Sequence, residues 1–97
     1  MKSEFLTHVS EQMQMKRYAK RTIESYLYWI KAYIVFNNKK HPKYCYNKEV
    51  ETFLSYLSNS KNVAPKTQAL ALNALSFLYK AILEQPLNSK LSVVGIQ

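Results

Sequence analysis

The sequence predicts an all-α domain, and three observations lead to this prediction. Apolar residues recur at the three- and four-residue spacing of a helix along most of the chain. Only one Gly and three Pro are present, too few for the tight turns of a many-stranded sheet. The 97 residues are enough for one modest core but not for two. We therefore expect a single compact bundle of four helices.

Two helices are predicted before residue 38. The first runs from about Ser3, its predicted N-cap, to Met15. The second runs from about Lys20 to Asn37 and has the clearest apolar stripe in the chain. The apolar residues are Phe5, Leu6, Val9 and Met13 in the first helix, and Ile23, Tyr26, Leu27, Ile30, Tyr33 and Ile34 in the second.

Residues 38–46 are predicted to form a loop, after which a third helix begins and ends near Ser60. Asn47 is the predicted N-cap of this helix. Glu49 and Glu51 follow in the first turn, where the helix dipole favours acidic side chains. The predicted buried residues of this helix are Val50, Phe53, Leu54 and Leu57.

The fourth helix is predicted from about Ala64 to Glu84, with Pro65 in its first turn and Pro86 after its end. Its predicted inward residues are Ala71, Leu75, Leu78 and Ile82, with Leu72 or Tyr79 at the edge. Residues 87–97 carry no periodic signal. We therefore expect one folded domain over residues 1–86, followed by a linker or frayed tail.

The positive charge is concentrated around the second helix. The formal net charge is +8, and residues 16–48 account for all of it, with nine Lys and Arg against Glu24. Scattered lysines are usually only solvated, but an excess held in one stretch favours a polyanion partner, either nucleic acid or an anionic membrane surface. Two clusters lie beyond opposite ends of the helix: Lys16, Arg17, Lys20 and Arg21, and then Lys39, Lys40, Lys43 and Lys48.

Few residues suit catalysis, a metal or a cofactor. Cys45 is the only cysteine, which excludes a disulfide framework, and no secretory signal is seen, so a reducing cytoplasm is expected. His41, Cys45 and His8 are too few to close a zinc site in a chain without Asp, and the single Gly excludes a phosphate-binding loop. The longest apolar run is far shorter than the roughly 20 residues of a membrane span. We expect no catalytic residue, no metal, no cofactor and no membrane.

The eight tyrosines allow two interpretations. Those on or beside apolar stripes are expected to pack, and these are Tyr26, Tyr33, Tyr56 and Tyr79. Those among basic residues could also stack on bases or bond to phosphate, and these are Tyr18, Tyr28, Tyr44 and Tyr46. Packing is the default for each of them taken singly.

Two predicted helix starts combine cations with backbone amides. Lys20-Arg21-Thr22 opens the second helix, with Ser25 one turn later on the side of Arg21. Lys66-Thr67-Gln68 opens the fourth, with Leu70 and Asn73 on the next turns. Basic side chains oppose the dipole at a helix start, but there they converge with free amides on a bound anion. Both starts are therefore candidates for contacting DNA.

The order of these motifs resembles a known family. Residues 18–34, from Tyr18-Ala-Lys-Arg-Thr22 to Ile34, are followed by Phe36 and an Asn-Lys-Lys-His-Pro loop. Glu49-Val-Glu51-Thr-Phe-Leu54, Val63-Ala-Pro-Lys-Thr67-Gln68 and Leu72-Asn-Ala-Leu-Ser-Phe-Leu-Tyr79 continue the pattern. Over roughly residues 3–84 the chain resembles the N-terminal core-binding domain of tyrosine recombinases, and most of all that of integron integrases.

The resemblance implies a SAM-like bundle of four or five helices that forms one half of a clamp around double-stranded DNA. In the family, the second and fourth helices cross the major groove at their N-terminal ends. Two residues depart from the family pattern. Ala19 stands where a Ser that caps the second helix is common. Leu70 stands where a polar residue that contacts a base is common, so Gln68 or Asn73 would make that contact instead. The predicted DNA-contacting residues are Lys16, Arg17, Lys20, Arg21, Thr22, Ser25, Lys66, Thr67, Gln68, Leu70 and Asn73.

The resemblance also implies what lies outside these residues. The family cleaves a phosphodiester with an Arg/His constellation and a Tyr nucleophile that belong to a C-terminal catalytic domain, expected beyond residue 97. None of the eight tyrosines is expected to be that nucleophile, so the chain is expected to be non-catalytic on its own. Its expected partners are recombination-site DNA in the bacterial cytoplasm, the catalytic domain, and further copies of itself on DNA.

Two other functions remain open at this point. A helical module for contacts between recombinase protomers would leave Phe5, Leu6 and Met13 partly exposed and could coexist with DNA binding; light scattering with and without DNA separates the two. A basic membrane-surface domain ranks last, because no lysine-rich amphipathic helix has an apolar face free of core packing. Sedimentation with liposomes would test it.

Overall fold

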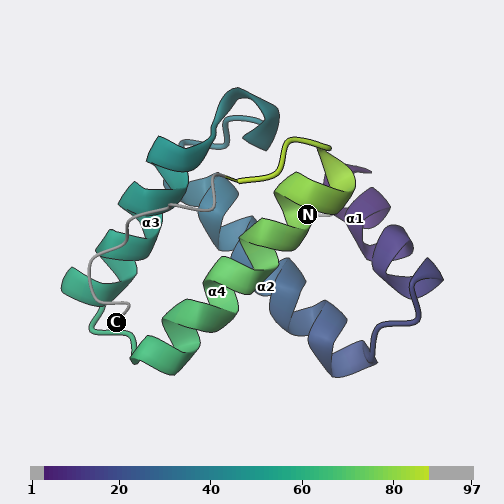
Figure 1. Cartoon of the computed structure of the whole chain (residues 1–97), viewed down its shortest axis with the longest axis horizontal. Helices are drawn as coiled ribbons and strands as arrows, with labels where there is room; N and C mark the ends of the chain where they lie inside the picture. The colour runs from purple at the N-terminus through teal and green to yellow at the C-terminus, as the bar shows by residue number, and fades with distance from the viewer. Residues whose placement is uncertain (1–3, 88–97) are drawn as a thin grey trace.

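Two crossing helices, α2 (Lys20–Phe36) and α4 (Pro65–Phe77), form the centre of the molecule. The structure is a computed structural model that describes residues 4–87. Helix α1 (Glu4–Met15) packs beside α2, and α3 (Asn47–Asn59) packs against α4 on the other side (Figure 1). All the regular elements of residues 4–87 are helices and none is a strand, so the all-α prediction is confirmed.

The apolar stripe of α2 forms the core as predicted. Ile23, Ile30 and Tyr33 are buried, and the other members of the stripe are half-buried against the same cluster. At 1.5 Å per residue this helix is about 25 Å long. It ends one residue earlier than expected, because Asn37 becomes its C-cap and donates its side-chain amide to the carbonyl of Tyr33 at 2.9 Å.

Helix α3 begins at Asn47, so the prediction that Asn47 is the N-cap is wrong by one residue. The cap is Tyr46, whose backbone N–H donates to the Glu49 carboxylate at 2.8 Å. This hydrogen bond lowers the pKa of Glu49 from its ordinary value. The predicted buried face is confirmed: Val50, Phe53, Leu54 and Leu57 are all buried.

The loop between α2 and α3 contains a short 3-10 helix, η1 (Pro42–Tyr44). The His41 side chain accepts a hydrogen bond at Nδ1 from the Lys43 backbone N–H at 3.1 Å, so this nitrogen carries no proton. The His41 ring packs edge-on against Phe5 of α1, with the centroids 4.6 Å apart. Burial and the Lys43 charge both lower the pKa of His41, which favours this neutral form.

The end of the fourth helix differs from the prediction. Helix α4 stops at Phe77, and the chain continues as a π-helical segment, η2 (Leu78–Ile82), in which the Leu83 N–H bonds to the Leu78 carbonyl five residues back. Leu78 is fully buried as predicted, and Ile82, also predicted inward, packs half-buried against the core. Placing Tyr79 at the edge was wrong: it is fully buried, because it lies four residues after Leu75 and shares its inward face.

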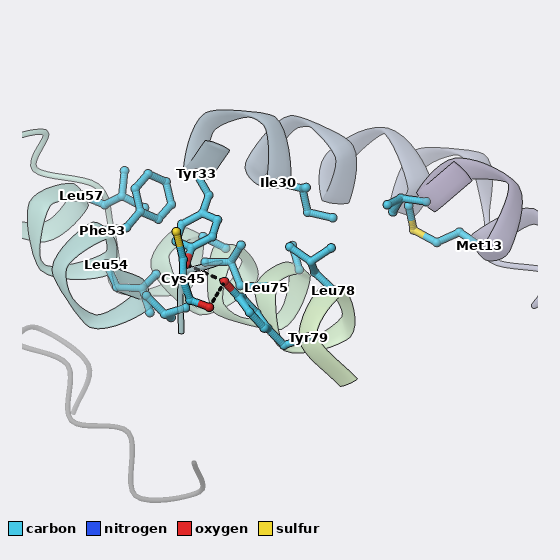
Figure 2. Close-up of a cluster of buried hydrophobic side chains, with 14 of the residues drawn as sticks. Met13, Ile30, Tyr33, Cys45, Phe53, Leu54, Leu57, Leu75, Leu78 and Tyr79 are labelled. Atoms are coloured by element: carbon cyan, nitrogen blue, oxygen red, sulfur yellow. Dashed lines mark hydrogen bonds between the residues drawn. The ribbon is translucent and has the colours of Figure 1, made fainter. Parts of the chain in front are cut away.

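The buried Tyr79 hydroxyl joins three parts of the chain. It lies 2.8 Å from the Pro42 carbonyl, 3.0 Å from the Cys45 carbonyl and 2.9 Å from the Tyr33 hydroxyl. Figure 2 shows Tyr33 of α2 and Tyr79 pointing toward each other beside Cys45. Tyr79 has a single hydroxyl hydrogen, so it donates toward the carbonyls and accepts from Tyr33. Burial raises the pKa of both phenols, which keeps both hydroxyls protonated.

The last described residues, Pro86 and Leu87, contact the folded part of the chain. Leu87, predicted as the first residue of the tail, packs partly buried against the core, and the Tyr46 hydroxyl donates to the Pro86 carbonyl. The rest of the predicted tail, 88–97, and the predicted cap Ser3 lie outside the described residues. No helix of residues 4–87 is long and apolar enough to cross a membrane.

We predict that Tyr79→Phe lowers the free energy of unfolding by about 2–3 kcal/mol, because two buried carbonyls and the Tyr33 hydroxyl lose their partner. Tyr33→Phe removes one hydrogen bond and should cost about 1 kcal/mol. In a domain of this size each kcal/mol corresponds to about 4–8 °C in Tm, measured by circular dichroism. Tyr28→Phe, at an exposed site, is the control. Equal Tm values for Tyr79→Phe and Tyr28→Phe would contradict the assignment.

Candidate nucleic-acid interface

The N-terminal ends of α2 and α4 lie along one edge of the bundle, at the bottom of Figure 1. Each helix runs from this edge toward the other end of the molecule, and the two cross on the way. Lys20-Arg21-Thr22 and Lys66-Thr67, which we call the helix-start edge, are therefore brought to the same side although they are far apart in the sequence. The loop between α2 and α3 stands at the opposite edge.

The start of α2 has no side-chain cap. Its N-cap, Ala19, is extended (φ −60°, ψ 146°), and its methyl group offers no acceptor to the first amides. The helix nonetheless begins at Lys20, as its spacing predicted. The amide groups of the first turn, which a Ser or Asp cap would bind, remain available to water or an anion.

The start of α4 repeats this geometry. Its N-cap, Ala64, is extended with nearly the same angles (φ −61°, ψ 149°), again without a side-chain cap, and Pro65 occupies the first turn. Pro has no amide hydrogen, so the first donors of α4 come from Lys66 and Thr67. Two helix starts of the same form, each followed by basic side chains, thus lie at one edge.

Most predicted contact residues reach the surface. Arg17, with φ 60°, turns the chain from α1 toward α2. The exposed residues are Lys16, Arg17, Lys20, Arg21, Lys66 and Asn73, and the half-buried ones are Thr22, Ser25, Thr67 and Leu70. The side chains of the exposed set need no rearrangement to meet a ligand.

Gln68 is the exception and corrects the prediction. Its side chain is fully buried, and its Nε2 donates to the Leu54 carbonyl of α3 at 2.6 Å. Gln68 therefore fastens the start of α4 to α3 and is not positioned to read a base. Gln68 lies three residues before Ala71 and seven before Leu75, so its helical position placed it on the predicted inward face, although its polar side chain favoured the surface. Asn73 remains the exposed amide of this helix.

A groove between α4 and the connection from α1 to α2 adds two residues that the sequence analysis missed, Ser76 and Lys80. Its walls also include Lys16 and Asn73, over aromatic side chains. Lys66, Asn73 and Lys80 recur every seven residues, which was a detectable signal for one exposed side of the fourth helix. The aromatic rings of this groove, Tyr18, Tyr26 and Phe77, have centroids 5.5–6.2 Å apart.

The tyrosines divide differently from the two predicted groups. Tyr18 is half-buried and its ring is tilted against Phe77, so its main role is packing. Tyr28, Tyr44 and Tyr46 are exposed. Cys45 is buried, in line with its interpretation as a small apolar residue, and burial raises the pKa of its thiol. Across the described part of the chain, no group of three or more His, Cys, Asp or Glu side chains could hold a metal ion.

Comparison with known proteins identifies the family. Residues 5–89 match the family described as "Phage integrase, N-terminal SAM-like domain". Proteins named "Integrase/recombinase" from Escherichia coli and Pseudomonas aeruginosa are each 37% identical over 78 residues, covering 80% of this chain and 23% of theirs. The crystal structure of XerA recombinase superposes with a TM-score of 0.75 at 26% identity, covering 97% of this chain and 31% of that chain.

The chain therefore belongs to the phage integrase N-terminal SAM-like domain family. It is an N-terminal domain of the tyrosine recombinase type, as the resemblance predicted. These 97 residues span about a quarter of the length of the curated relatives they match.

We predict that Gln68→Ala and Asn73→Ala act on different properties. Gln68→Ala should lower the free energy of unfolding by about 1–3 kcal/mol, because the Leu54 carbonyl loses its donor and a cavity forms. Asn73→Ala should leave the Tm within about 2–4 °C, since surface substitutions are usually worth less than 0.5 kcal/mol. Thermal melts of both variants test this. A Gln68→Ala protein with an unchanged Tm would show that the side chain is not held in the interior.

Proposed function

We propose that this domain binds the DNA of a recombination site through its helix-start edge, as the non-catalytic half of a tyrosine recombinase. The observation that carries the proposal is the pair of helix starts on one edge that have alanine N-caps and no side-chain cap, followed by exposed Lys20 and Arg21 in α2 and by exposed Lys66 in α4. Membership of an integrase family supports it. In this role the 97 residues hold DNA, while strand cleavage belongs to the catalytic domain.

The chemistry available at this edge suits phosphate more than base recognition. The Lys20 and Lys66 ammonium groups act as point charges, and the Arg21 guanidinium can bind a phosphate with two parallel hydrogen bonds. Uncapped amides add donors that do not depend on DNA sequence. Contacts to bases require side chains that reach past the DNA phosphates, and Asn73 and Ser25 are the polar candidates. We therefore expect modest affinity and weak sequence preference from this domain alone.

We further propose that the protein is of the integron integrase type. This finer assignment rests on the His41-Pro42 loop and on the order of the motifs along the chain. In the structure this loop is the segment to which the Tyr79 hydroxyl bonds, so the residues that carry the resemblance also contribute to the core.

The alternative, a protein-interaction module, has one observation in its favour. An apolar groove between α2 and α3 is lined by aromatic side chains, and its Tyr28 and Val35 are 65% and 53% exposed. Against it, Met13 is fully buried, although this function predicted an exposed side chain there. Phe5 and Leu6 are half-buried against the core. We rank DNA binding first.

We predict that binding to duplex DNA falls steeply with salt. If about six phosphates are neutralised, log K against log[salt] should have a slope near −5. Lys20→Ala, Arg21→Ala and Lys66→Ala should each weaken binding to duplexes of any sequence and reduce the slope by about 1. Fluorescence anisotropy at several salt concentrations measures both quantities.

Lys31→Ala serves as the matched control for these variants. Lys31 is exposed on the same helix, but it lies about 16 Å further along α2 than Lys20. Its removal should leave the affinity and the slope nearly unchanged. Flat binding between low and moderate salt would contradict a phosphate interface. Unchanged affinity in all three variants would show that DNA binds to a surface other than the helix-start edge.

A further inference from the structure

The loop between α2 and α3 carries a cluster of cations that the proposed function does not use. Lys39, Lys40, Lys43 and Lys48 are exposed and fall within ten residues of sequence. Glu49 is the acid that follows them; its carboxylate is bonded to the Tyr46 N–H, and it interacts electrostatically with Lys40 and Lys48. With four lysines against two carboxylates, those of Glu49 and Glu51, the segment stays positive. We call Lys39, Lys40, Lys43, Tyr44 and Lys48 the lysine loop.

The lysine loop is held in place by the core below it. The Tyr79 hydroxyl binds the carbonyls of Pro42 and Cys45, on either side of Lys43 and Tyr44. Within the loop, the Tyr44 N–H bonds to the His41 carbonyl at 2.9 Å and the Lys43 N–H to the His41 imidazole at 3.1 Å. The backbone that presents these cations is therefore largely ordered before any ligand arrives, which lowers the entropic cost of binding.

Tyr44 adds a second kind of contact to the lysine loop. Its side chain is 64% exposed although the neighbouring Pro42 and Cys45 are buried. The Lys43 Nζ lies 5.1 Å from the centroid of its ring, so charge and phenol are presented together. Tyrosine hydroxyls and lysines are both common phosphate ligands on DNA-binding surfaces. An anionic membrane fits less well, because Pro42 and Cys45 are buried and the exposed aromatic residues, Tyr44 and Tyr46, carry polar hydroxyls in place of a bulky aliphatic face that could insert.

The lysine loop and the helix-start edge lie at opposite ends of α2, about 25 Å apart. Figure 1 shows the loop at the top and the starts of α2 and α4 at the bottom. A straight duplex lying along the bottom edge leaves the lysine loop facing away from it. A nucleic acid bound by the loop would therefore be a different segment.

We propose that the lysine loop binds the phosphate backbone of a second DNA segment, so that one domain can bridge two duplexes. All its cations are lysines, which contact phosphate as point charges, so binding here is independent of base sequence. The bridging proposal rests on the proposed function for its first duplex, which the helix-start edge binds; the second duplex is bound by the lysine loop. Binding to one duplex and pairing of two duplexes are separate measurements, so pairing can fail while the proposed function stands, whereas loss of single-duplex binding contradicts the proposed function itself.

The test is a pairing assay with the 97-residue chain and two short duplexes that carry a donor and an acceptor fluorophore. The wild-type chain should bring the duplexes together, and with DNA in excess analytical ultracentrifugation should find one chain per two duplexes. The loop variant Lys39→Gln/Lys40→Gln/Lys43→Gln should reduce pairing by about tenfold or more, because three phosphate contacts are lost. Its affinity for a single duplex in anisotropy should fall by less than about threefold, through weaker long-range attraction alone.

The charge-matched control is Lys20→Gln/Arg21→Gln/Lys66→Gln, which also removes three positive charges but at the helix-start edge. It should lose most of its affinity for a single duplex. Circular dichroism melts of both variants should match the wild type, since all six positions are exposed. Tyr44→Ala is a further variant, expected to weaken pairing by about threefold with single-duplex binding unchanged.

Several results would overturn the bridging proposal. The first is a wild-type chain that binds one duplex and does not pair two, which would leave the proposed function intact. The second is pairing that the loop variant retains. The third is a complex of two chains with two duplexes, which would mean that pairing comes from a protein dimer. The last is binding of the lysine loop to phosphatidylserine vesicles with no pairing of DNA, which would make a membrane its ligand.

Discussion

The hydrogen bonds of the Tyr79 hydroxyl are the interaction on which the rest of the architecture depends. This one group, in a π turn after α4, binds two carbonyls of the loop between α2 and α3 and the Tyr33 hydroxyl of α2. It thereby fixes the end of α4 to the end of α2, while Gln68 fastens the start of α4 to α3. Because buried polar groups are costly when unpaired, this network favours one crossing arrangement of the helices over alternatives with similar apolar burial. The crossing in turn carries the two helix starts to a common edge.

Most of the fold could be predicted from hydrophobic spacing, and the failures have local physical causes. The stripe from Ile23 to Ile34 identified the central helix, and the Glu49 first turn identified the third, because both signals depend on neighbours within one helix. Tyr79 lies four residues after Leu75, a spacing that also faces inward, so its burial agrees with the helical period. Apolar spacing contains no signal for the hydrogen bonds of its hydroxyl, which depend on the loop between α2 and α3. The cap of α3 was misplaced by one residue for a related reason: the Glu49 carboxylate reaches back to Tyr46, so the acid and not the Asn47 side chain determines where the helix begins.

For the candidate interface, the sequence identified the cations and the structure determines which of them are neighbours. Lys20 and Lys66 could be chosen because each follows a predicted helix start, but only the crossing of α2 and α4 brings these starts to one edge. Gln68 was misassigned because its polar side chain suggested the surface, whereas its helical position lies on the inward face of Ala71 and Leu75. Lys80 was missed although it continues the spacing of Lys66 and Asn73. The two alanine N-caps became informative only in the structure, which shows the same backbone geometry at both. Each of the two helices starts without a side-chain acceptor, and basic side chains follow at both starts.

The central claim is that the two uncapped helix starts form one DNA-binding edge. Its most direct test is a two-dimensional ¹H–¹⁵N NMR titration of the ¹⁵N-labelled chain with a short duplex. The account predicts that the amide signals of Lys20, Arg21, Thr22, Lys66 and Thr67 shift together with a common dissociation constant, because one duplex contacts both starts. Shifts limited to one start, or absent from both while other surface amides respond, would contradict it.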